Sequence, residues 1–293
     1  MKIFYCHYSK KSEDKLNRFE PSDIYQGVYF KSEIEPVNGH QQLSYADYFP
    51  HKVFGDQPID EFLSEFKEQK TNQQKKLFYF LQRDYCYQEK SNKSLPIITF
   101  SNHQNWDQKS PIYAKIVKCK LHTITDYHIL NCEKSKLQNL KSIRLDANGL
   151  FTKESFSHFF NELDPVIKNK IEYMEDPGMD LNWNHYPLPL ARDFLDGFPF
   201  HVQIFKPNRS IFDEEWKNNE IPIIFSSYQG SDLGHWHCYN ELLDFGNINL
   251  THGIADKSPI FDIENDYYCP NNLQVKKMYD ELTKVSWNYL CTI

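Results

Sequence analysis

The sequence predicts an α/β protein in which a TIM-like (β/α) barrel follows a small α+β domain. From about residue 96 onward, short apolar segments typical of buried strands alternate with segments of helical spacing. Two of these strands, at 143–146 and 171–175, end in a carboxylate, the position from which barrel enzymes draw site residues. The first 95 residues lack this alternation. We therefore divide the chain into an α+β domain, residues 1–95, and a barrel domain, residues 96–293.

The first 95 residues predict a small antiparallel sheet followed by helices. Short apolar and aromatic strands are expected at 2–8 and 24–33, separated by a polar loop. Residues 45–56 are aromatic but show neither helical nor strand periodicity, so we expect a structured loop there. Residues 59–82 have apolar residues at helical spacing with a polar break near Thr71, which favours two helices in a hairpin.

Seven segments after residue 95 have the composition of strands. They lie at 96–101, 113–121, 142–146, 171–175, 187–193, 201–207 and 221–227, with helices expected at 123–141, 152–163, 210–219, 232–245 and 272–290. Thr152 is expected to cap the second of these helices. Seven strands come close to the eight of a (β/α) barrel.

Composition and charge exclude several classes of protein. The 293-residue chain carries a net charge of −7 with the signs mixed, so it has no basic surface for nucleic acid. No apolar run is long enough to span a bilayer or to serve as a signal-peptide core. The seven cysteines are scattered, with no CxxC pair. We expect a cytoplasmic protein with reduced thiols and no nucleic acid or membrane partner; its oligomeric state stays open.

Charged residues gather at the predicted strand ends. A barrel brings the ends of parallel strands to one mouth, where we expect Lys118, Lys120, Asp146, Glu175, Asp193 and Lys206. Carboxylates from three strands can bind one hard divalent cation. A lysine beside a cation and a second ammonium group has a lowered pKa, which suits a general base. The pattern predicts abstraction of a proton next to a substrate carboxylate.

At these positions the sequence resembles the enolase superfamily, and within it most closely the o-succinylbenzoate synthases of menaquinone biosynthesis. The matching segments are the KxK of VKCKL (117–121), RLDAN (144–148), MEDP (174–177), ARD (191–193) and QIFKP (203–207). The segment YADYFPHKVFGD (45–56) resembles the capping-domain loop that closes over substrate. The resemblance implies a modified, enolase-type barrel with an N-terminal α+β capping domain.

The resemblance also implies a role for each residue. Lys120 would be the base, Lys118 would assist it, and Lys206 would stabilise the enolate from the opposite face. Asp146, Glu175 and Asp193 would bind Mg²⁺, with Mn²⁺ as a possible substitute. Ser226 and Ser227 would meet the succinyl carboxylate of a small-molecule substrate. The implied reaction is dehydration of 2-succinyl-6-hydroxy-2,4-cyclohexadiene-1-carboxylate to o-succinylbenzoate.

Several alternatives stay open. Phe194 follows Asp193 where many relatives carry Glu, and the segment before Lys206 is short, so Asp196 is a second candidate for the third metal ligand. An N-succinylamino acid racemase or a dipeptide epimerase would use the same lysines, and a non-catalytic binding barrel is a further hypothesis. His235 and His237 form a His-x-His pair, which we interpret as polar packing residues and not as a zinc site.

Overall fold

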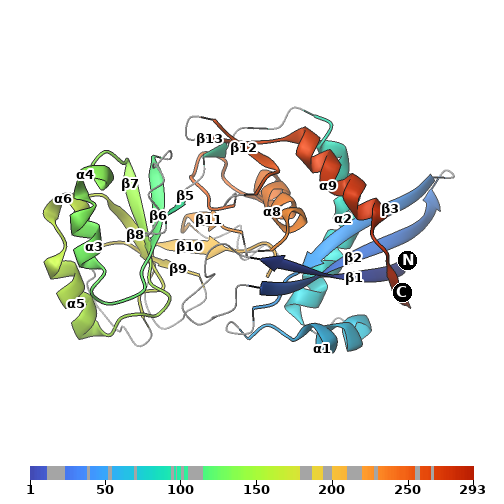
Figure 1. Ribbon diagram of the computed structural model, residues 1–293, viewed down its shortest axis with the longest axis horizontal. Coiled ribbons are helices and arrows are strands. Elements are labelled where there is room, and N and C mark those ends of the chain that lie inside the picture. The colour runs from blue at the N-terminus through green and yellow to red at the C-terminus, as the bar shows by residue number, and fades with distance from the viewer. Residues whose placement is uncertain are drawn as a thin grey trace.

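The protein folds around three β-sheets. The structure, a computed structural model, describes residues 1–11, 24–37, 40–51, 55–68, 71–93, 96, 98–99, 102–104, 115–178, 187–193, 200–209, 220–227, 230–254, 258–264 and 267–293. The sheets are an antiparallel sheet of four strands, a parallel sheet of seven and a small antiparallel sheet of three. Figure 1 shows the four-stranded sheet at one end of the molecule and helices α3 to α6 at the other.

The seven-stranded sheet winds in chain order, with each strand placed beside its predecessor. It comprises β5 (Asn102–Gln104), β6 (Ile116–Lys120), β7 (Ser142–Asp146), β8 (Ile171–Glu175), β9 (Leu190–Arg192), β10 (Val202–Phe205) and β11 (Ile223–Phe225). All its strand pairs are parallel. Beyond β11, Ser226 makes a further parallel bridge to Gly253. This order is the one that a βα repeat produces when each helix returns the chain to the same edge.

The parallel sheet is curled. Arg144 on β7 donates through Nη1 to the carbonyl of Thr251, which follows β11, at 2.9 Å. On a flat sheet, the four strand spacings from β7 to β11 would put the two about 20 Å apart. One arginine side chain does not reach that far, so the sheet bends toward a half-barrel.

Helices cover the outer face of β6 to β8. They are α3 (Tyr127–Cys132), α4 (Lys134–Leu137), α5 (Lys153–Glu162) and α6 (Pro165–Lys168). Alternate strand residues such as Val117, Cys119 and Leu145 pack against helix residues such as Phe156 and Phe159. Because strand side chains alternate between faces, the intervening lysines and carboxylates point into the curl. Thr152 caps α5 in a capping box with Ser155, which confirms the predicted cap.

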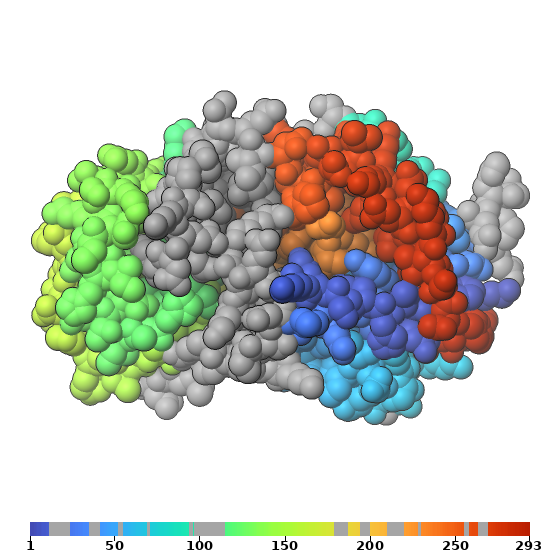
Figure 2. All heavy atoms as spheres, in the orientation of Figure 1, coloured from blue at the N-terminus to red at the C-terminus, as the bar shows by residue number. Residues whose placement is uncertain are grey.

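The last strand of the chain belongs to the N-terminal sheet. It contains β1 (Lys2–Lys11), β2 (Ile24–Val37) and β3 (His40–Tyr48), and β14 (Asn288–Thr292) pairs antiparallel with β1. Around it lie α1 (Ile59–Ser64), η2 (Phe66–Glu68), α2 (Asn72–Lys90), α8 (Asp232–Phe245) and α9 (Asn272–Lys284). In Figure 2 the red C-terminal segment lies against the blue N-terminal strands. The division at residue 95 stays a prediction, but part of 96–293 completes the N-terminal sheet.

One hydrophobic core joins this sheet to the parallel sheet. It includes Phe30, Phe62 and Trp236, and also Phe205 and Phe225 from the outer face of β10 and β11. Helix α8 supplies Trp236 to this core and packs against β3, α2 and α9. Among the described helices, none combines the length and the apolarity needed to cross a bilayer.

The structure corrects four local predictions. The predicted loop at 45–56 begins as strand, because β3 runs to Tyr48 and is buried on both faces, which hides the alternation. The strand predicted at 96–101 appears as β4 (Ile98–Thr99), which pairs antiparallel with β13 (Tyr267–Pro270) beside β12 (Phe261–Glu264). The helix predicted at 123–141 breaks at Glu133, and the one at 272–290 ends at Lys284, where β14 pairing takes over. The helix predicted at 210–219 lies outside the described residues.

Candidate active site

The site residues form a row across three neighbouring strands. Lys120 on β6 is in register with Asp146 on β7, which is in register with Glu175 on β8. Residues in register on parallel strands point to the same face, so these three side chains share the inner face of the curl. Lys118 lies two residues before Lys120 and points the same way. The predicted convergence of these four residues is therefore observed.

Lys118 lies between the two carboxylates. Its Nζ is 3.1 Å from Oδ2 of Asp146 and 2.7 Å from Oε2 of Glu175, and all three side chains are buried. Asp146 also accepts a hydrogen bond from Nδ2 of Asn148 at 2.7 Å. Burial disfavours the ammonium form, but Asp146 and Glu175 outweigh it and raise the pKa of Lys118 well above its ordinary value. Lys118 is thus a fixed positive charge.

Lys120 behaves in the opposite way. Burial lowers the pKa of Lys120, and the charges of Lys118 and Lys206 lower it further against the pull of Asp146 and Glu175. The effect of Lys206 is informative, because that residue follows β10, four strands away in the sheet order. The curl of the sheet therefore brings the two lysines into one electrostatic environment. A lysine with a lowered pKa gives up its proton more readily than an ordinary lysine, as a general base must.

Glu175 is a buried carboxylate whose pKa is strongly raised by its surroundings. Burial and the nearby charges of Asp146 and Asp193 raise the pKa of Glu175 to about 7, although Lys118 and Lys206 act in the other direction. A glutamate that is repelled by two other carboxylates gains from a bound cation. The three acids named from the sequence thus influence one another.

Asp193 and Lys206 form an ion pair at the ends of β9 and β10. The backbone N–H of Asp193 donates to Oδ1 of Asp176 at 3.0 Å, which holds the end of β9 against β8. Asp176 itself adopts a left-handed backbone conformation with φ of 43° directly after Glu175. The strand ends are therefore linked by side chains as well as by the sheet ladder.

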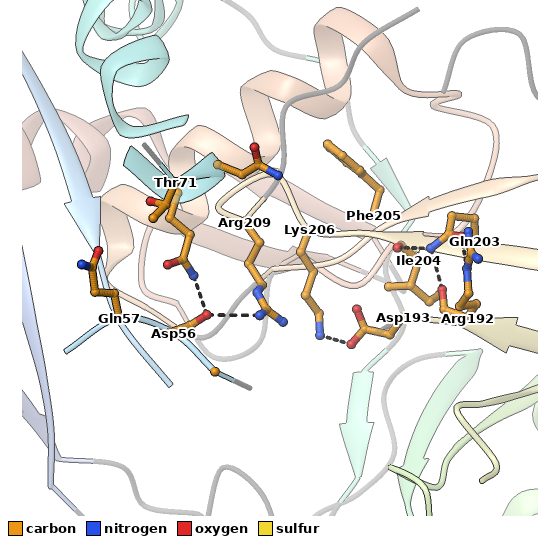
Figure 3. A pocket seen from close by; sticks show the side chains of 13 residues that line it. Asp56, Gln57, Thr71, Arg192, Asp193, Gln203, Ile204, Phe205, Lys206 and Arg209 are labelled. Carbon is orange, nitrogen blue, oxygen red and sulfur yellow. Dashed lines mark hydrogen bonds and ion pairs between the residues drawn. The ribbon is translucent and has the colours of Figure 1, made fainter. Parts of the chain in front are cut away.

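A pocket of about 560 Å³ opens beside this ion pair. One wall is formed by the N-terminal segments, with Gly55, Asp56, Gln57, Thr71, Asn72 and Gln73, and the other by Arg192, Asp193, Gln203, Ile204, Phe205, Lys206 and Arg209. Figure 3 shows Lys206 pointing to Asp193, and Arg209 beside it pointing to Asp56. The segment that resembles a capping loop, 45–56, thus ends at the pocket.

The three acids have the chemistry to bind a hard cation, but their side chains are not gathered around one point. Asp146, Glu175 and Asp193 offer carboxylate oxygens, the donors that Mg²⁺ prefers. Within the part of the chain that the structure describes, no three acidic, histidine or cysteine side chains are gathered as one ion would need. Asp193 instead pairs with Lys206. The alternative ligand Asp196 lies outside the described residues.

The serines named from the sequence occupy the end of β11. The hydroxyls of Ser226 and Ser227 each lie 3.4 Å from the carbonyl oxygen of Gly253. Neither is among the described residues that line the pocket. Their contact with substrate stays a prediction.

Sequence reasoning missed Arg209, Gln73 and Arg192 as pocket residues. Arg209 has a weak signal, since it follows Lys206 by three residues, and Arg192 lies in the matching segment ARD (191–193), but Gln73 has none. The histidine pair is buried in α8, where Nε2 of His237 contacts Oδ1 of Asp84 at 2.8 Å. Burial lowers the pKa of His235 to about 3. Their interpretation as packing residues agrees with this placement.

No protein-family model matches the sequence, and no curated protein matches it. Solved structures match nearly the whole chain. An o-succinylbenzoate synthase from Thermosynechococcus elongatus BP-1, complexed with Mg in its active site, matches with a TM-score of 0.61 and 14% identity over 96% of this chain and 100% of that one. A member of the enolase superfamily from Polaromonas sp. JS666 matches with a TM-score of 0.64 and 12% identity over 92% and 93%.

A dipeptide epimerase from Methylococcus capsulatus, complexed with a Mg ion, matches with a TM-score of 0.59 and 12% identity over 92% of this chain and 97% of that one. At these identities the likeness shows the fold. The curled parallel sheet and the antiparallel sheet are consistent with the enolase-type fold that the resemblance implied, whereas a complete barrel and an N-terminal cap stay predictions.

Proposed function

We propose that the protein is an o-succinylbenzoate synthase, which removes water from 2-succinyl-6-hydroxy-2,4-cyclohexadiene-1-carboxylate to form o-succinylbenzoate. One observation carries the proposal: Lys120 ends β6, Lys206 directly follows β10, and three acids lie at the ends of the three strands between them. This set provides a base, an opposing positive charge and carboxylates for a cation.

Lys120 is the base in this proposal. Its lowered pKa gives it a share of neutral amine at a pH where an ordinary lysine is fully protonated. The amine takes the proton from the substrate carbon that bears the carboxylate. The same group then returns the proton to the departing hydroxyl, so the C–H and C–O bonds break, water leaves and the ring becomes aromatic. Lys206 stabilises the negative charge that develops on the carboxylate.

Asp146, Glu175 and Asp193 would hold Mg²⁺, or Mn²⁺ in its place. For this, the carboxylate of Asp193 would have to leave its ion pair with Lys206 and bind the ion instead. If bound there, a divalent cation would supply positive charge that offsets the negative charge developing on the substrate carboxylate. Lys118 keeps Asp146 and Glu175 side by side. In this proposal the parallel sheet is the larger part of a modified (β/α) barrel and the N-terminal sheet is its cap.

The charge of the pocket bears on the substrate. Its described lining carries three cationic side chains, Arg192, Lys206 and Arg209, against Asp56 and Asp193. A net positive lining favours a substrate with a second carboxylate, such as a succinyl group, over a dipeptide with a free ammonium group. The second candidate is therefore an N-succinylamino acid racemase, and a dipeptide epimerase comes after it. We propose a cytoplasmic enzyme that acts on small molecules, with no nucleic acid or membrane partner.

The test is an ultraviolet assay of the purified protein with the cyclohexadiene substrate. We expect the diene absorbance to fall in the presence of Mg²⁺ and to stay constant after EDTA treatment. In parallel, N-succinylamino acids and dipeptides are incubated with the protein in D₂O, and deuterium at the α-carbon is followed by NMR. Exchange without loss of diene would move the assignment to racemisation or epimerisation, and inactivity in both assays would favour a binding barrel.

A further inference from the structure

Asp56 joins three segments of the chain beside the pocket. Its Oδ2 accepts from the backbone N–H of His51 at 2.8 Å, and its Oδ1 accepts from Nε2 of Gln73 and from Nη2 of Arg209, the latter at 3.1 Å. The three donors are the backbone of His51, which follows β3, a side chain in the first turn of α2 and a side chain in the segment after β10. One carboxylate therefore links the N-terminal wall of the pocket to the strand wall.

Arg209 ends the turn that begins at Lys206. The backbone N–H of Arg209 donates to the carbonyl of Lys206 at 2.9 Å, so the four residues 206–209 form one closed turn. Within the turn, Asn208 accepts a hydrogen bond from the thiol of Cys238 on α8. The turn is thus held on one side by α8 and on the other by Asp56.

The link is shielded from water at its acidic end. The side chain of Asp56 is 1% exposed and that of Arg209 is 21% exposed. A carboxylate buried to this degree depends on its partners, because without them its charge is left unpaired in a medium of low dielectric constant. The two side chains point to each other across the pocket in Figure 3, next to Lys206.

We infer that Asp56 is a positioning residue for Lys206. Asp56 holds Arg209, and Arg209 holds the turn 206–209 in place. The position of this turn determines where the ammonium group of Lys206 lies relative to Asp193 and the pocket. This inference rests on the proposed function for the role of Lys206, but the mechanical link from Asp56 to the turn does not. An error of about 1 Å in the placement of a charged group costs up to roughly 100-fold in rate.

The test compares Asp56→Asn, Arg209→Met, their double variant and Arg83→Met. Asparagine keeps the shape and the acceptor for His51 but loses the charge. Arg83→Met is the matched control, because Arg83 Nη2 pairs with Asp244 at 2.6 Å and also joins α2 to a later helix, away from the pocket. Hydrogen exchange of peptides covering 202–209 and turnover with the cyclohexadiene substrate are both measured.

We expect exchange in 202–209 to rise about tenfold in both single variants and no further in the double variant, since the two residues act as one unit. We expect kcat to fall by about 10- to 100-fold in both single variants. KM should change less than about threefold in Asp56→Asn, whereas Arg209→Met also removes a cation from the pocket lining and should raise KM. Arg83→Met should change neither. Unchanged exchange in both Asp56→Asn and Arg209→Met, or a raised exchange with unchanged kcat, would overturn the inference. Raised exchange in the two single variants, together with a wild-type protein that turns over none of the substrates, would support the link and overturn the proposed function instead.

Discussion

Among the described residues, two clusters each bury a lysine beside a carboxylate, and the two differ in how the charges are satisfied. The helix cluster comprises Lys76, Tyr79 and Tyr87 on α2 with Glu241 on α8. The site cluster comprises Lys118, Asp146 and Glu175 on the inner face of the parallel sheet. Lys76 and Glu241 are 1% and 0% exposed, and Lys118 and Glu175 are 9% and 3% exposed, so burial alone does not distinguish them.

In the helix cluster the single carboxylate accepts hydrogen bonds from one lysine and two tyrosine hydroxyls. Glu241 accepts from Lys76 Nζ at 2.8 Å, from the Tyr79 hydroxyl at 2.8 Å and from the Tyr87 hydroxyl at 2.7 Å. Burial lowers the pKa of Lys76, and its one acidic partner only opposes this. Such a network specifies packing.

In the site cluster the carboxylates outnumber the lysine between them. Their mutual repulsion, added to burial, raises the pKa of Glu175 to about 7, and the excess negative charge raises the pKa of Lys118. A buried group of like charges is unfavourable for folding and is more typical of functional sites than of packing. The comparison teaches that the balance of a buried cluster, and not its presence, indicates function.

The largest expected effect comes from Lys120→Ala. Loss of the general base should reduce kcat by about 10²- to 10⁴-fold, while the free energy of unfolding changes little because no ion pair of the helix cluster is touched. The measurements are steady-state kinetics and urea unfolding, with Lys115→Ala as the control, an exposed lysine just before the same strand. Retained turnover would remove Lys120 as the base.

The reverse result is expected for Lys76→Met. It leaves Glu241 buried without its cation, so the free energy of unfolding should fall by about 3–5 kcal/mol with kcat unchanged at a temperature where the variant is folded. The double variant Lys76→Met/Glu241→Gln should recover most of the loss in urea unfolding. A loss of turnover in the folded Lys76→Met protein would erase the distinction between the two clusters.

Asp146→Asn tests the excess of charge directly. We expect the affinity for Mg²⁺, measured by isothermal titration calorimetry, to fall by more than about 100-fold. Loss of a residue that only orients a metal ligand typically costs roughly 10- to 100-fold, and loss of a ligand itself should cost more. The variant should unfold at about the same urea concentration as the wild type without Mg²⁺, because repulsion with Glu175 is relieved. Unchanged affinity would contradict the assignment of the acids as ligands.

The smallest effect concerns a buried group that is kept neutral. His252 accepts from the backbone N–H of Phe225 at 3.0 Å and contacts the carbonyl of Asn247 at 2.9 Å, and burial lowers the pKa of His252 to about 4. The unfolded chain binds this proton below about pH 6.5, so the stabilisation is present above that pH and is lost as the pH falls toward 4.

His252→Gln should therefore flatten the acid dependence of stability by about 2 kcal/mol between pH 7 and pH 4.5. The control is His122→Gln, at an exposed position. The free energy of unfolding is measured by urea unfolding at several pH values. If wild type and His252→Gln depend equally on acid, then folding does not lower the pKa of the His252 ring.

Much of the fold followed from local pattern. Buried strands such as 142–146 and 171–175 were predicted because alternation decides which residues share a face, and the winding of the sheet followed from the βα repeat. The pairing of β14 with β1 and of β4 with β13 could not be predicted, because those strands are short and their partners lie far away in sequence.

The sequence by itself determined which site residues share a face: Lys118, Lys120, Asp146 and Glu175 follow from strand period and register. Only the tertiary structure decided how they interact. The curl of the sheet brings Lys206 close enough to lower the pKa of Lys120, and the carboxylates beside Lys118 raise its pKa instead. The links from Asp193 to Lys206 and from Asp56 to Arg209 likewise depend on distances across the fold, which no local pattern encodes.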